Sequence, residues 1–238
     1  MTTSPQPYAR LAGLLYLVII AAGIFGELAV RGSMVASGDA ALTAARIAAS
    51  PDRWRLGIAI DLLMHVCDVF VMWSLYALFR VVNRRLALLV LLFNLVQTAV
   101  LVANKLFLLV PLMLLGDAPY LHGVPATQLQ AWSYVAIRLH EHGFGIGLIF
   151  FGVVCVLEGH LIRRSGFLPR TIGMLMQVAG VCYLVNSLAQ LLAPSLQGVL
   201  FPWVMLPVFV AETSFALWLL IRGVDAGGWQ RRMDATRP

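Results

Sequence analysis

The sequence predicts an all-α protein, a polytopic transmembrane bundle of six helices with both termini in the cytoplasm. Of its 238 residues, 61% are hydrophobic and 12% are charged. In soluble domains, roughly 45–50% of residues are hydrophobic and ~25% are charged. Six apolar runs are also each near or above the ~20 residues that a helix needs to cross a bilayer. Disordered chains, coiled coils and ordinary cytosolic enzymes are therefore excluded.

The six predicted spans cover residues 9–30, 56–79, 86–115, 135–161, 171–192 and 200–221. The first run is longer than the 7–15 apolar residues of a signal peptide, so we expect a retained helix. The third contains Pro111, which predicts a kink or an exit from the membrane at its outer end. The connecting segments are short, and we expect a single membrane domain over residues 1–224.

The arginines predict the orientation of these spans. Eleven lie on the side that carries both termini and five lie on the other side, and the arginine-rich side of a membrane protein faces the cytoplasm. Residues 225–238 then form a basic cytoplasmic tail, which we expect to be disordered. In the first outer loop, Asp39 should cap a short helix over residues 40–49. Membrane lipids are the expected partner, and nucleic acid is not.

The second span carries Asp61, His65 and Asp68 at steps of four and three residues. This spacing places all three on one face of a helix. Ionisable groups inside membrane helices usually face the bundle interior and mark functional sites. The pattern fits a proton relay, general acid/base chemistry or half of a metal site, and equally a structural stripe of hydrogen bonds between helices.

The third span contributes Gln97, Asn104 and Lys105. An unpaired ammonium is costly at that depth, so we expect Lys105 to pair with Asp61 or Glu27, or to reach outward to the headgroups. The fourth span begins with Arg138, His140 and Glu141. Arg138 and Glu141 are three residues apart and should form an ion pair. Glu158, at the inner end of this span, is expected to lie in solvent near the headgroups.

The remaining polar candidates are Glu212 in the sixth span and the pair Asn186 and Gln190 in the fifth. Their expected depths suggest one intramembrane polar pocket that opens outward. We assign hypothetical catalytic roles to five of its residues: Asp61, His65, Asp68, His140 and Glu212. Six others are assigned to ligand binding: Glu27, Gln97, Asn104, Lys105, Asn186 and Gln190. No spacing signature specifies a metal site, and no cofactor is indicated.

Four stretches carry a resemblance to a known family: RLAGLLYL (10–17), HEHGFGIGLIFFG (140–152), RRSGFLPRTIGML (163–175) and AETSFALWLLIRG (211–223). They resemble the domain-of-unknown-function 4386 family of bacterial multi-pass membrane proteins, over nearly the whole chain. The resemblance implies a six-span protein of the cell membrane and carries no activity. It also favours His140 over His142 as the functional histidine, since that second position resembles a tyrosine in relatives.

Several functions remain open at this point. The chain is an integral membrane protein without an assigned activity, and its polar pocket suggests binding of a small polar or lipophilic ligand. One alternative is a membrane enzyme that uses buried acids and histidine on a lipophilic substrate, with a zinc hydrolase as a variant. Others are a small-molecule transporter and an accessory or sensory subunit whose polar stripe is structural.

Overall fold

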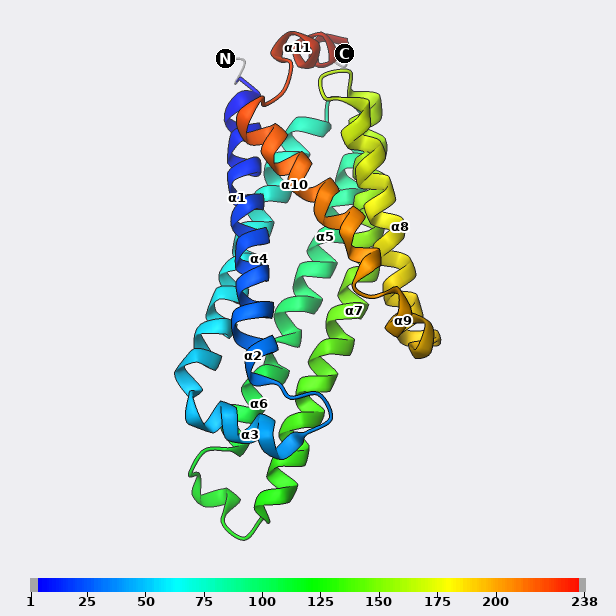
Figure 1. The fold of residues 1–238 in the computed structure, drawn as a ribbon. Coiled ribbons are helices and arrows are strands. Elements are labelled where there is room, and N and C mark those ends of the chain that lie inside the picture. The colour runs from blue at the N-terminus through cyan, green and yellow to red at the C-terminus, as the bar shows by residue number, and fades with distance from the viewer. Residues whose placement is uncertain (1–3, 236–238) are drawn as a thin grey trace. The chain divides into compact units, whose positions relative to one another are not determined.

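The computed structural model describes residues 4–235, and every regular element in that range is a helix (Figure 1). Its elements are α1 (Gln6–Ile24), the π-helical segment η1 (Phe25–Arg31), α2 (Gly32–Met34), α3 (Ala40–Ala49), α4 (Pro51–Phe79), α5 (Arg84–Asn104), α6 (Leu106–Leu114), η2 (Pro119–Leu121), α7 (Ala126–Ser165), α8 (Arg170–Leu192), α9 (Pro194–Leu200), η3 (Trp203–Met205), α10 (Leu206–Ile221) and α11 (Ala226–Ala235). A helix satisfies every backbone polar group internally, which is what a segment surrounded by lipid requires.

Within residues 4–235, six stretches are long and apolar enough to cross a membrane, which confirms the predicted number of spans. They are Gln6–Met34, Pro51–Phe79, Arg84–Leu114, Ala126–Ser165, Arg170–Leu192 and Trp203–Ile221. Large apolar side chains remain exposed on them, for example Leu14 (51%) and Leu63 (56%). Such surfaces suit contact with acyl chains.

The contacts group the described residues into two compact units. Unit 1 holds residues 4–19, Cys67–Thr98 and residues 145–235, and unit 2 holds Ile20–Val66 and Ala99–Phe144. Helices α1, α4, α5 and α7 each contribute residues to both units. The single membrane domain over residues 1–224 stays a prediction.

Unit 1 is built on close helix approach through small residues. A Cβ atom at Gly180 of α8 would lie 2.6 Å from the Gly152 carbonyl oxygen of α7, and one at Gly173 would lie 2.6 Å from the Gly159 carbonyl oxygen. Only glycine at these positions lets the two backbones approach so closely. Gly13 plays the same part between α1 and α10, where a Cβ would lie 2.5 Å from the Leu220 nitrogen.

Helix α11 corrects one prediction. We expected a disordered tail, whereas residues 226–235 form a helix at one end of unit 1 (Figure 1). The Trp229 side chain is 4% exposed and donates a hydrogen bond from Nε1 to the Leu78 carbonyl oxygen at 3.1 Å. Arg232 Nη2 donates to the Arg164 carbonyl oxygen at 2.8 Å. Burial of one indole, invisible to a composition argument, therefore holds this polar segment in place.

Unit 2 has its own apolar core. Val30, Met34, Ile47, Trp54 and Leu108 are among its buried members. The indole Nε1 of Trp54 donates to the Leu108 carbonyl oxygen at 2.7 Å, so the aromatic ring is buried without an unsatisfied donor.

Helix α3 packs beside this core and begins where the sequence predicts. The Asp39 carboxylate accepts a hydrogen bond from the Leu42 backbone N–H at 2.8 Å. This confirms the predicted cap and the helix over residues 40–49.

The third span is interrupted earlier than Pro111 suggests. Helix α5 ends at Asn104 and α6 begins at Leu106, so the break falls at Lys105. Pro111 lies inside α6. Pro207 lies in the first turn of α10, where a missing backbone N–H breaks no hydrogen bond of the helix.

Candidate functional site

An intramembrane ion cluster forms in unit 2 around the carboxylate of Asp61. Its Oδ2 accepts a hydrogen bond from Lys105 Nζ at 2.7 Å and another from Arg31 Nη1 at 2.7 Å. The Asp61 side chain is 1% exposed and that of Lys105 is 4% exposed. The predicted pairing of Lys105 with Asp61 is thereby confirmed.

Arg31 links this pair to Glu27. The guanidinium Nε donates to Glu27 Oε2 at 2.9 Å, within one turn of η1. Two cations and two carboxylates therefore balance one another. The Glu27 side chain is 67% exposed, whereas Asp61 and Lys105 are buried, and pairing of this kind is what allows buried ions to be tolerated away from water. We name these four residues, together with His65, Asn104 and His140, the Asp61 cluster.

His140 extends the cluster from helix α7. Lys105 Nζ lies 3.3 Å from His140 Nε2. An ammonium can only donate, so Nε2 is the acceptor and a neutral imidazole then carries its proton on Nδ1. Asn104 Nδ2 donates to the His140 backbone carbonyl at 2.8 Å and fixes this turn of the helix. Asp61, Lys105 and His140 thus form a hydrogen-bonded series of three titratable groups.

Several buried polar atoms of the Asp61 cluster have no hydrogen-bond partner among the described residues. They are Asp61 Oδ1, His65 Nε2, Asn104 Oδ1 and His140 Nδ1. Buried polar groups are nearly always satisfied, and each exception calls for a proton, a water molecule or a ligand. In the Asp61 cluster every charge is therefore paired, but several buried polar atoms still lack a hydrogen bond within the described part of the chain.

Two irregular stretches of helix meet the cluster. Glu27 and Arg31 lie in η1, whose π-helical turns replace regular α-helix, and Lys105 occupies the break between α5 and α6. Leu108 N donates to the Lys105 carbonyl at 3.0 Å across that break. Irregular helix inside a membrane segment is expensive and is frequent at functional sites.

Unit 1 holds the other predicted acids, in two separate groups. Asp68 Oδ2 accepts a hydrogen bond from Asn94 Nδ2 at 2.9 Å and a short one from the Thr98 hydroxyl. Glu212 Oε1 accepts from the Tyr183 hydroxyl at 2.8 Å. In residues 4–235 no basic side chain pairs with either carboxyl group. These acids are held by neutral donors.

Glu158 departs from its expected setting. We placed it in solvent near the headgroups, but its side chain lies in the protein and the residue is 2% exposed. Its Oε1 has no hydrogen-bond partner among the residues that the structure describes. Helix α7 continues beyond the predicted end of its span, to Ser165, and this places Glu158 inside the helix packing.

The predicted site residues are therefore divided by the structure. Glu27, Asp61, His65, Asn104, Lys105 and His140 come together in unit 2. Asp68, Gln97, Asn186, Gln190 and Glu212 belong to unit 1. The single outward-opening pocket that would join all eleven stays a prediction. Among residues 4–235, no three His, Cys, Asp or Glu side chains are placed to hold a metal ion together.

Two contacts of the candidate site residues were not predicted from the sequence. Arg31 enters the sequence argument only as one of the five arginines on the outer side, although it lies four residues after Glu27, a spacing typical of an ion pair within a helix. The spacing of Glu27 and Arg31 could therefore have predicted this ion pair from the sequence. Thr98 also went unnoticed, because a threonine inside an apolar run carries no sign of its bond to Asp68. The predicted Arg138–Glu141 ion pair is confirmed.

Comparison with known proteins agrees with the resemblance in the sequence. The family described as domain of unknown function (DUF4386) matches residues 11–223. An uncharacterized protein of Archaeoglobus fulgidus is 25% identical over 161 residues, which cover 68% of this chain and 80% of that protein. No solved structure matches. With six candidate membrane spans and a family match over nearly its whole length, the chain belongs to the DUF4386 family.

Proposed function

We propose that this chain is a multi-pass protein of the cell membrane that binds a small polar ligand at the Asp61 cluster. The observation that carries the proposal is the unfilled hydrogen-bonding capacity of that cluster, above all at Asp61 Oδ1 and His140 Nδ1. A carboxylate oxygen accepts and a protonated Nδ1 donates. The fitting ligand therefore carries both a donor and an acceptor, as a hydroxyl or amide compound does.

Proton exchange is part of this proposal. Asp61, Lys105 and His140 are joined in series by contacts of 2.7 and 3.3 Å. A ligand that bonds to either end changes which of the three groups best holds a proton, so binding and proton movement are linked. The same residues would support the enzymatic alternative, in which buried titratable groups and His140 exchange protons with a lipophilic substrate.

Native mass spectrometry of the purified protein in mild detergent tests the proposal. Three proteins are compared: wild type, Asp61→Asn/Lys105→Met and Asp68→Asn/Glu212→Gln. The first double variant removes one positive and one negative charge, so the cluster stays neutral. We expect a discrete bound mass on wild type and on the Asp68/Glu212 variant, and its loss from the Asp61/Lys105 variant.

Two results would contradict the proposal. Loss of the bound mass only from Asp68→Asn/Glu212→Gln would move the site to unit 1. Absence of any bound mass from all three equally folded proteins would favour a structural or accessory role for the polar residues. Circular dichroism and the melting temperature establish equal folding.

Transport is a second candidate, and the irregular helices favour it. Discontinuous helices place charged groups and free backbone atoms at the binding sites of many transporters, and η1 and the break at Lys105 both belong to the Asp61 cluster. Uptake of the compound identified by mass into proteoliposomes would support transport. Conversion of that compound without uptake would favour the enzyme.

The proposed orientation has both termini in the cytoplasm. It is supported by the excess of arginines on that side and by contacts within unit 1. Gln6 Nε2 donates to the Val224 carbonyl at 2.6 Å, which brings the start of α1 beside the end of α10. An even number of spans between two neighbouring ends leaves both on one side of a membrane.

A further inference from the structure

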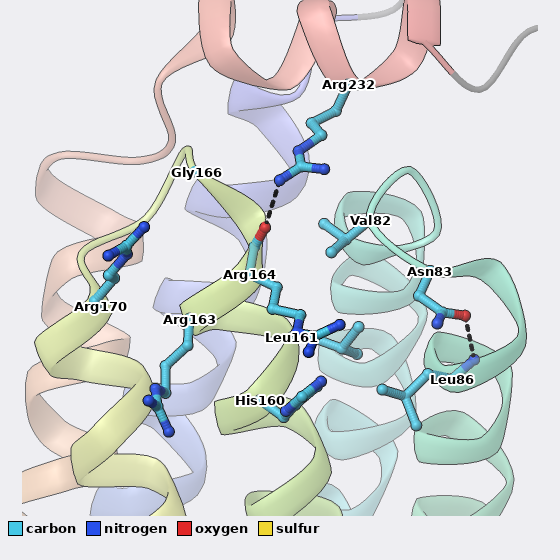
Figure 2. Close-up of a pocket in the computed structure, with 10 residues that line it drawn as sticks. All are labelled: Val82, Asn83, Leu86, His160, Leu161, Arg163, Arg164, Gly166, Arg170 and Arg232. Atoms are coloured by element: carbon cyan, nitrogen blue, oxygen red, sulfur yellow. Dashed lines mark hydrogen bonds between the residues drawn. The ribbon is translucent and has the colours of Figure 1, made fainter.

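A pocket of about 430 Å³ opens at the end of unit 1 that carries the α7–α8 turn (Figure 2). All its lining residues belong to unit 1, and it shares none of them with the Asp61 cluster. Five of its lining residues are basic: His160, Arg163, Arg164, Arg170 and Arg232. None of the lining residues is acidic.

Two of the arginines that line this pocket have no acidic partner in the described part of the chain. Within residues 4–235, neither Arg164 nor Arg170 forms an ion pair. The acids of the neighbouring segment do not line the pocket. Asp225 accepts from the Gly227 backbone and lies 3.7 Å from Arg231, and Asp234 accepts from Gln230 Nε2. Several like charges around one hollow attract a counter-ion.

Other members of the lining hold the pocket in shape. Arg163 Nη1 donates to Gln177 Oε1 at 2.8 Å, and Arg232 Nη2 donates to the Arg164 carbonyl at 2.8 Å. In Figure 2, Arg232 reaches from α11 to the end of α7, and Arg164 extends into the space beside Leu161 and His160. Asn83 Oδ1 accepts from the Leu86 backbone N–H at 3.0 Å, which leaves its amide N–H groups as donors.

The helix terminus and the apolar side chains at this pocket suit an anion that also has an apolar portion. Helix α8 begins at Arg170 without a side-chain cap, so its N-terminal N–H groups and dipole add to the positive field. Val82, Leu86 and Leu161 supply apolar lining. Arginine guanidinium groups match phosphate oxygens in pairs of parallel hydrogen bonds.

We propose that this pocket binds a phosphate group, with Arg164 and Arg170 as its principal ligands. Two sources share that chemistry: the headgroup of an anionic phospholipid and a soluble phosphate compound. The alternative is that these arginines act only through their bulk charge, as arginines beside membrane spans generally do.

Binding of two probes to the purified full-length protein in neutral detergent separates these possibilities. One probe is inorganic phosphate, followed by isothermal titration calorimetry. The other is phosphatidylglycerol, counted by native mass spectrometry against phosphatidylcholine. The pocket variant is Arg164→Gln/Arg170→Gln. Its matched control is Arg84→Gln/Arg85→Gln, which removes the same charge from exposed positions outside the pocket.

We expect the pocket variant to bind at least about tenfold more weakly, since it loses two charge-assisted contacts, and the control to bind nearly as wild type does. If the pocket variant alone binds inorganic phosphate more weakly, the ligand is a soluble phosphate compound. If the pocket variant alone binds phosphatidylglycerol more weakly and phosphate binding does not change, the ligand is a lipid headgroup. Equal weakening in both variants would overturn the proposal in favour of bulk charge. Absence of binding by both probes to wild type would overturn it as well. Arg232 is left unchanged because it anchors α11.

Discussion

Lys105 Nζ lies 2.7 Å from Asp61 Oδ2, and both side chains are almost fully buried. The two residues come from different helices, and the same carboxylate oxygen also receives Arg31. Desolvation makes the burial of two opposite charges costly in free energy, and removal of one partner costs far more because the other charge then stays buried and unpaired. This relationship determines how unit 2 should respond to substitution.

We expect Asp61→Ala to destabilise the protein by about 3–5 kcal/mol, because Lys105 then stays buried without an anion. Asp61→Asn/Lys105→Met should be much less damaging. Thermal unfolding in detergent provides the comparison. Asp52→Ala, which removes an exposed partner of Arg55, is the control and should change little. A loss as small for Asp61→Ala as for Asp52→Ala would show that the pair is not buried in the folded protein.

A single methyl group at Gly180 should separate α7 from α8. The added Cβ would lie 2.6 Å from the Gly152 carbonyl oxygen, backbone that cannot rotate away. We expect Gly180→Ala to cost about 1–3 kcal/mol, as overpacking does. Gly198→Ala is the matched control, since nothing lies within 4 Å of that position, and it should be neutral or slightly stabilising. Equal melting temperatures for both variants would refute the close approach.

The hydrogen bond from Tyr183 to Glu212 should be measurable as a coupling energy. Hydrogen bonds between membrane helices average about 0.6 kcal/mol and reach about 1.7 kcal/mol. A double-mutant cycle of Tyr183→Phe and Glu212→Leu, in which each substitution removes one partner of the bond, should give a value in this range when read by thermal unfolding. Strict additivity of the two substitutions would mean that the 2.8 Å contact contributes nothing.

Trp229→Ala should release α11 while leaving the membrane helices intact. The substitution removes a buried indole and its bond to the Leu78 carbonyl. Hydrogen–deuterium exchange followed by mass spectrometry should then show fast exchange over residues 226–235. Gln230→Ala, which loses only a contact within α11, should retain slow exchange. Unchanged exchange in Trp229→Ala would mean that another contact anchors the helix.

Labelling of engineered cysteines tests the orientation. In a background without the three natural cysteines, Asp117→Cys should react with a membrane-impermeant maleimide in intact bacterial spheroplasts. Arg231→Cys should react only after the membrane is opened. Asp117 follows α6 and Arg231 lies in α11, and both are exposed. The opposite pattern would place the termini outside.

Hydropathy and residue type determined much of this architecture in advance. Six spans, the helix capped by Asp39 and the pairing of Lys105 with an acid all follow from rules that act within one helix or on one unpaired charge. A lone ammonium in a membrane span needs an acid, and Asp61 and Glu27 were both candidates until the structure chose Asp61. These features can be predicted from a single sequence because they depend only on the spacing of nearby residues or on the large free-energy cost of an unpaired charge in a membrane.

Tertiary structure decided what local rules cannot. It brought Arg31 onto Asp61, buried Glu158 and ordered α11 through Trp229. It also gave Asp68 and Glu212 to unit 1 and the Asp61 cluster to unit 2. It also gathered the arginines of distant turns around one pocket. Each of these outcomes depends on which helices pack together, and helix packing follows from backbone contacts at glycines such as Gly152 and Gly180. The sequence therefore determined which charges need partners, and the packing of the helices decided which partners they have.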